Sequence, residues 1–116
     1  MNDNNLDRLY SALESRTEKE KFVRTVKRID SLVQELADLA GAANEWGEQN
    51  GHPEIENYPQ HGRVQQLGKE FHNIAGHLGM QAALRSAQKK LGDYPPTNYT
   101  YAIIEYGWSG IGGWEP

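Results

Sequence analysis

The sequence contains no cysteine, and this absence removes several kinds of chemistry at once. Disulfide bonds, thiolate metal sites and cysteine nucleophiles all need a sulfur atom that the chain does not have. The absence also weakly favours a reducing compartment, because structural disulfides are rare there. We therefore expect a cytoplasmic protein.

Long apolar runs are also lacking. Hydrophobic residues make up 37% of the 116 positions, and no run approaches the roughly 20 residues that span a bilayer. Residues 1–5 offer neither a basic nor an apolar stretch, so we expect no signal peptide. The length is that of one domain, and we predict a single helical domain over residues 1–116 with no membrane association.

Lysine and arginine are missing from residue 94 onward, where most of the aromatic residues lie. Glycines are interleaved with these rings, and glycine does not continue a helix cheaply. Tyrosine and tryptophan bury large areas with few rotatable bonds, so they are typical of cores and of interface anchors. The tail therefore either packs on its own core or binds a partner or a second copy. The predicted partner-binding residues are Tyr106, Trp108, Ile111 and Trp114.

Residues 17–46 carry the strongest helical pattern in the chain. Apolar side chains alternate spacings of four and three at Phe22, Val26, Ile29, Val33, Leu36, Ala40 and Ala43. Leu32, Leu39 and Trp46 widen this stripe. A wide stripe favours packing within a bundle, whereas a narrow seam is typical of a two-stranded coiled coil. A homodimeric seam remains the alternative.

Shorter periodic stretches predict further helices at 4–14, 63–75, 80–91 and 99–106. The second of these has apolar residues at Val64, Leu67, Phe71 and Ile74, and the same spacing continues beyond it to Leu78. Gly76 and Gly79 interrupt the pattern, residues 47–62 read as a loop, and a strand is the alternative for 99–106. We predict an all-α fold, a small irregular bundle of four to five helices with the aromatic, glycine-rich tail packed on it.

One alternative function comes from residues 63–91. Residues 74–80 resemble the first helix and turn of helix–turn–helix DNA-binding proteins, with Gly79 at the turn. The resemblance implies that the next helix meets DNA through Arg85, Lys89 and Lys90. Arg85 departs from the pattern, which has an apolar residue there. The net charge of −4 also makes nucleic acid the less favoured partner.

Four histidines suggest a second alternative, a metal-binding protein or enzyme using the region from His52 to His77. These histidines are His52, His61, His72 and His77. Metal ligands on one helix stand three or four positions apart, whereas His72 and His77 stand five apart across Gly76. The spacing therefore favours histidines without a metal.

Motifs for catalysis are not found. Asp30, Glu35 and Asp38 lie near one another on the long helix, but their pattern is that of a solvated polar face. The glycines near the end of the chain do not lie between a strand and a helix, as a phosphate-binding loop requires. We therefore expect no catalytic residue, no cofactor and no metal.

The segment from Trp108 to Trp114 reads Trp-Ser-Gly-Ile-Gly-Gly-Trp. It resembles the Trp-x-Gly-Ile-Gly-x-Trp ending of small uncharacterised bacterial helical proteins. The resemblance implies a bacterial source and no particular activity. The favoured function is a small non-enzymatic module for protein–protein interaction or regulation, with a homodimer as one form of it.

Overall fold

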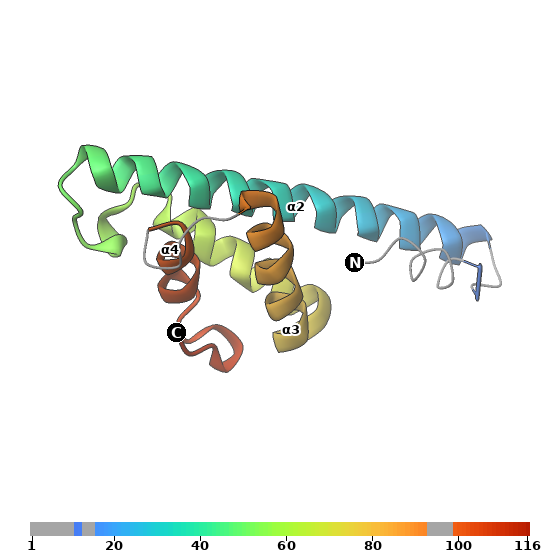
Figure 1. Ribbon diagram of the computed structural model, residues 1–116. Coiled ribbons are helices and arrows are strands. Elements are labelled where there is room, and N and C mark those ends of the chain that lie inside the picture. Colours follow the sequence, from blue (N-terminus) through green and yellow to red (C-terminus); the bar gives the residue numbers. More distant parts are fainter. Residues whose placement is uncertain (1–10, 13–15, 93–98) are drawn as a thin grey trace. The chain divides into compact units, whose positions relative to one another are not determined.

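The structure is a computed structural model that describes residues 11–12, 16–92 and 99–116. These residues form three α-helices and two short 3₁₀ helices (Figure 1): α2 (Arg16–Gln49), η1 (Ile55–Asn57), α3 (His61–Leu91), α4 (Tyr99–Gly107) and η2 (Ile111–Gly113). The described part contains no strand, which confirms the all-α class. None of its helices combines the length and the apolar character that crossing a bilayer requires.

The number of helices differs from the four to five that we predicted, because the described part has three. The helices predicted at 63–75 and 80–91 are joined in one element, α3. The helix predicted at 4–14 lies outside the described residues except for Ser11 and Ala12, which are helical. The segment 99–106 is helical, as α4, rather than the strand that was its alternative.

The chain divides into two compact units, Met1–Leu32 and Val33–Pro116, and the boundary between them falls within α2. In the first unit the structure describes residues 11–12 and 16–32. Phe22, Val26 and Ile29 are half-buried there, and Val23 is exposed. An ion pair between Arg16 and Glu20, with Nε and Oε1 3.2 Å apart, spans one turn of α2. The single domain over residues 1–116 stays a prediction.

The second unit has its own hydrophobic core. Its buried members on α2 are Val33, Leu36, Ala37, Ala40 and Ala43, which continue the predicted stripe. The buried members on α3 are Val64, Leu67, Phe71, Met80, Ala83 and Ala87. The last buried group comes from α4 and the tail, with Ile103, Ile104, Trp108 and Trp114. Helix α4 lies against α3 and η1, and η2 lies against α3.

The segment between α2 and α3 is a loop, as predicted, with the single turn of η1 inside it. Tyr58 ends this turn and is buried, and its ring lies 5.4 Å from that of Trp46. The Tyr58 hydroxyl donates a hydrogen bond of 3.0 Å to the Leu39 carbonyl of α2. Burial raises the pKa of this hydroxyl. The contacts of Tyr58 fasten the loop to α2.

Helix α3 changes direction sharply near its middle (Figure 1). Ala75 and Gly76 have non-helical backbone angles, and Gly76 has a φ of 65°, which favours glycine. Gly79 has a different role, because a Cβ atom there would lie 2.7 Å from the Ala75 Cβ and 2.9 Å from the Phe71 carbonyl oxygen. Gly76 therefore makes the break, and Gly79 lets the second half of α3 begin close to the first.

Candidate functional site

Trp108 packs directly on the first half of α3. Its side chain is fully buried, and its indole Nε1–H donates a hydrogen bond of 2.9 Å to the Val64 carbonyl. A Cβ atom at Gly68 would lie only 2.6 Å from the Trp108 ring, so this glycine makes room for the indole. The Phe71 ring lies 6.0 Å away and completes the pocket around Trp108. The beginning of the tail is thus part of the core.

The tail after Trp108 folds into a closed turn. The backbone N–H of Gly110 donates to the Trp114 carbonyl at 2.9 Å, and the N–H of Trp114 donates to the Ile111 carbonyl at the same distance. Gly112 has a φ of 55°, and a Cβ atom there would lie 2.3 Å from the His72 ring. This turn returns Trp114 to Trp108, with the two ring centroids 5.1 Å apart in an edge-on arrangement.

Trp114 is buried, but its indole Nε1–H has no acceptor among the described residues. An unpaired buried donor costs about 1–3 kcal/mol, and buried polar groups in native proteins are nearly always paired. The His77 ring also contacts the Trp114 ring, with the two centroids 5.4 Å apart. The end of the tail therefore packs against the start of the second half of α3.

A surface pocket of about 380 Å³ opens where the second half of α3 meets α4 and the tail. We call it the tail pocket. It is lined by His77, Gln81, Leu84, Arg85, Glu105, Trp114 and Glu115. Its volume falls within the range of about 300–1,000 Å³ that is usual for ligand pockets.

The charges of the tail pocket are divided between its walls. Arg85 projects from α3, whereas Glu105 comes from α4 and Glu115 from the tail. None of these three side chains forms an ion pair within the described part of the chain. His77 and Gln81, one turn apart on α3, share a hydrogen bond of 3.2 Å. The tail pocket therefore combines the aromatic ring of Trp114 with a cationic wall from α3 and an anionic wall from α4 and the tail.

Leu78 is the most exposed large apolar side chain in the described part, with 74% of its surface accessible. It stands three positions before Gln81 and seven before Arg85, so it shares one helix face with these two pocket residues. The apolar spacing of the helix predicted at 63–75 extends to Leu78 in the sequence, but Leu78 does not belong to the buried face. The break at Ala75–Gly76 puts the second half of α3 out of phase with the first, which turns Leu78 outward.

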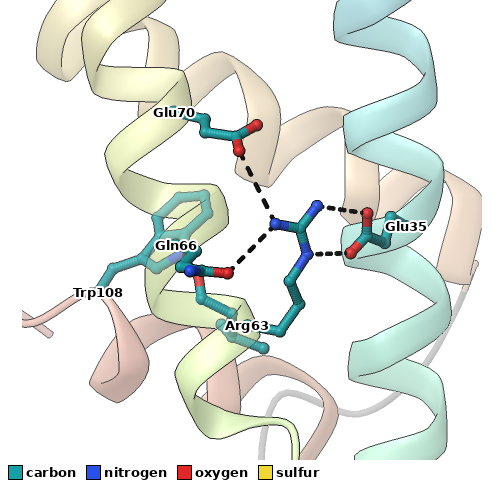
Figure 2. Close-up of polar contacts among 6 residues, drawn as sticks. Glu35, Arg63, Gln66, Glu70 and Trp108 are labelled. Carbon is teal, nitrogen blue, oxygen red and sulfur yellow. Dashed lines mark hydrogen bonds and ion pairs between the residues drawn. The ribbon is translucent and has the colours of Figure 1, made fainter.

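A polar cluster joins α2 to α3 on another face of α3 (Figure 2). Arg63 donates two hydrogen bonds to the Glu35 carboxylate, one of them from Nη2 at 2.7 Å. Its Nη1 also contacts Gln66 at 3.3 Å and Glu70 at 3.8 Å. The hydrogen bonds from Arg63 lower the pKa of Glu35 against the opposing effect of burial. This arrangement fixes the two helices and leaves no free acid or base, so we assign it a structural role.

The predicted partner-binding residues do not share one environment. Trp108 and Trp114 are buried against α3, Ile111 is half-buried, and Tyr106 is exposed. The two tryptophans therefore lie inside this structure rather than on its surface, because glycines at 68 and 112 admit the tail closely. Trp114 contributes to the surface where it forms a wall of the tail pocket.

The residues of the DNA-binding alternative lie together on the second half of α3. Arg85, Lys89 and Lys90 are all exposed. The break in the helix falls at Ala75–Gly76, three residues before the predicted turn at Gly79. Gly92 ends the helix with a φ of 74°, as predicted, and its N–H donates to the Gln88 carbonyl at 3.1 Å.

The histidines of the metal alternative are spread over separate places. His52 is exposed in the loop, His61 begins α3, and His72 and His77 contact different parts of the tail. Among the described residues no three histidine or acidic side chains lie in an arrangement that would hold a metal ion.

No family model, no curated protein and no solved structure matches the chain. The likeness of residues 108–114 to small bacterial helical proteins stays a prediction. The geometry of the second unit is therefore what points to a function.

Proposed function

We propose that this protein is a small non-enzymatic module that binds another protein at the tail pocket and the neighbouring Leu78. The exposure of Leu78 carries this proposal, because the side chain lies beside a pocket with a tryptophan wall. Covering a leucine side chain on binding stabilises a complex by roughly 1.5–3 kcal/mol. Single exposed apolar residues are common on protein surfaces, so exposure alone would not indicate a binding site. Leu78 supports the proposal because it lies beside the pocket.

The chemistry of the tail pocket supports a binding role. Its charged side chains come from different elements and lack the mutual hydrogen bonds that would orient an acid and a base for proton transfer. An aromatic wall beside an exposed apolar side chain, with charges at the rim, is the composition of a protein-binding surface. The proposal places this role in the cytoplasm, in keeping with a chain that has no cysteine.

A pull-down from an extract of the source cells tests the proposal. Leu78→Ser is expected to lose the partners that the wild type retains, while its melting temperature stays unchanged because Leu78 is exposed. Val23→Ser is the matched control, since it removes an exposed apolar side chain from the first unit. Equal recovery of all partners by the wild type and Leu78→Ser would overturn the proposal.

DNA binding remains a second candidate because Arg85, Lys89 and Lys90 are exposed on one helix that follows a sharp break. A gel shift over a salt series addresses it, since contacts to phosphates make the affinity fall steeply as salt rises. Replacing Lys89 and Lys90 by glutamine would weaken such binding and leave partner capture through Leu78 unaffected.

A further inference from the structure

We propose that the partner at the tail pocket is a second copy of this chain. In this dimer each copy inserts Leu78 into the tail pocket of the other, and Arg85 of each copy faces Glu105 and Glu115 of the other. The inference rests on the proposed function, because it names the partner of the same surface.

The first support comes from the separation of charge across the tail pocket. The wall from α3 is cationic through Arg85, and the wall from α4 and the tail is anionic through Glu105 and Glu115. These charges have no ion-pair partner within the described part of the chain. They are therefore free to meet charges on another molecule.

A two-fold axis makes such a surface complementary to itself. In a symmetric dimer the same patch occurs on both subunits, and each contact between two different residues occurs twice. Turning the patch through half a rotation sets the cationic wall of one copy against the anionic wall of the other. A surface of a single charge would repel its own copy, whereas this surface attracts it.

The second support is the fit between the pocket and the residue beside it. A cavity of about 150 Å³ is enough to hold a benzene molecule, so a pocket of about 380 Å³ admits a leucine side chain. Leu78 is exposed to 74% and lies on the same helix face as Arg85. One patch therefore carries both the inserting side chain and the receiving pocket.

Sedimentation equilibrium of the full chain tests the dimer. The wild type is expected to dimerise with rising concentration, and Leu78→Asp is expected to weaken the dimer at least about tenfold, which corresponds to one step of 1.4 kcal/mol. Val23→Asp, on the first unit, should dimerise like the wild type. Circular dichroism melts of each variant establish that it is folded.

Two charge reversals give a sharper test. Arg85→Glu makes both walls of the tail pocket acidic, and Glu105→Lys makes the pocket more basic, so each variant alone should dimerise more weakly than the wild type. Mixed in equal amounts, they should form a heterodimer, because each cationic wall then meets an acidic one. If the mixture dimerises again, both variants must be folded, so the weak dimerisation of each variant alone comes from its changed charge.

The inference fails if the wild type stays monomeric, if the single reversals dimerise like the wild type, or if their mixture stays dissociated. A different result decides the proposed function. A monomeric wild type that loses its cellular partners in Leu78→Ser keeps the proposed function and removes the dimer. A monomeric wild type whose partners survive that substitution removes both.

Discussion

At the scale of single residues, the contact between Gly68 and Trp108 decides where the tail lies. The indole rests on the backbone of α3 at Gly68, where a Cβ atom would lie only 2.6 Å from the ring. From there its N–H reaches the Val64 carbonyl, one turn earlier on the same helix. The position of Trp114 and the wall that it gives to the tail pocket depend on this contact, because the two rings touch.

Gly68→Ala is therefore expected to destabilise the protein, although alanine normally favours a helix. A Cβ atom at 2.6 Å from the ring forces Trp108 to move, and overpacking of this kind costs typically about 1–3 kcal/mol. Gly62→Ala, in the first turn of the same helix, is the matched control, since nothing lies within 4 Å of its Cβ position. Urea unfolding measures both variants. Equal stability of the two would show that Trp108 does not rest on Gly68.

At the scale of elements, the cluster around Arg63 joins α2 to α3. Arg63 and Glu35 stand 28 positions apart in the chain and form a two-bond contact between the helices (Figure 2). Each side chain is about one-third exposed, at 33% for Arg63 and 37% for Glu35, so solvent screens the pair. We expect it to set the register of the two helices more than to hold them together.

The lowered pKa of Glu35 gives this contact a pH dependence. Its folded pKa lies below its ordinary value of 4.5, so the stabilisation is fully present above pH 4.5 and is lost as the pH falls through the folded value. Glu35→Gln is expected to lower the free energy of unfolding by about 1 kcal/mol or less at neutral pH. When the pH is lowered, the variant should then lose less stability than the wild type does. Thermal melts between neutral and acid pH measure this effect.

Asp38→Asn serves as the control for that series, because the Asp38 carboxylate bonds to Gln34 of its own helix at 2.9 Å. It is expected to keep the acid dependence of the wild type. If Glu35→Gln also keeps it, the contact between Arg63 and Glu35 does not stabilise the fold.

Much of the secondary structure could be predicted from local spacing. The apolar period along residues 17–46 gave α2, and Gly92 gave the end of α3, because both depend on neighbours within a turn or two. The break in α3 was also indicated by Gly76, although not its effect on Leu78. The apolar spacing before the break does not predict which residues after the break face the core, because the break rotates the second half of α3 relative to the first.

The candidate site could not be predicted in the same way, because its parts are distant in the chain. Trp108 rests on a glycine and a carbonyl about 40 positions earlier, and the walls of the tail pocket come from Arg85, Glu105 and Glu115. No periodic pattern relates these positions. The sequence did single out Trp114 and Arg85, but for two different functions, and the structure places them in one pocket.

At the scale of the whole molecule, the described chain is a helical protein whose aromatic tail belongs to the core of residues 33–116. Both tail tryptophans are buried, while Leu78 on the second half of α3 is exposed. The tail therefore helps to form the candidate binding surface by walling its pocket, and the exposed contact residue comes from α3. This division between a buried tail and an exposed helix face is the central claim of our account.

Hydrogen exchange of the three tryptophan indole protons, followed by nuclear magnetic resonance, tests that claim most directly. We expect the Trp108 proton to exchange only through global unfolding, because the ring is fully buried and bonded to Val64. The half-buried Trp46 should exchange faster. Exchange of Trp108 at the rate of an exposed indole would contradict the account, since the tail would then be a free segment and its tryptophans the binding surface.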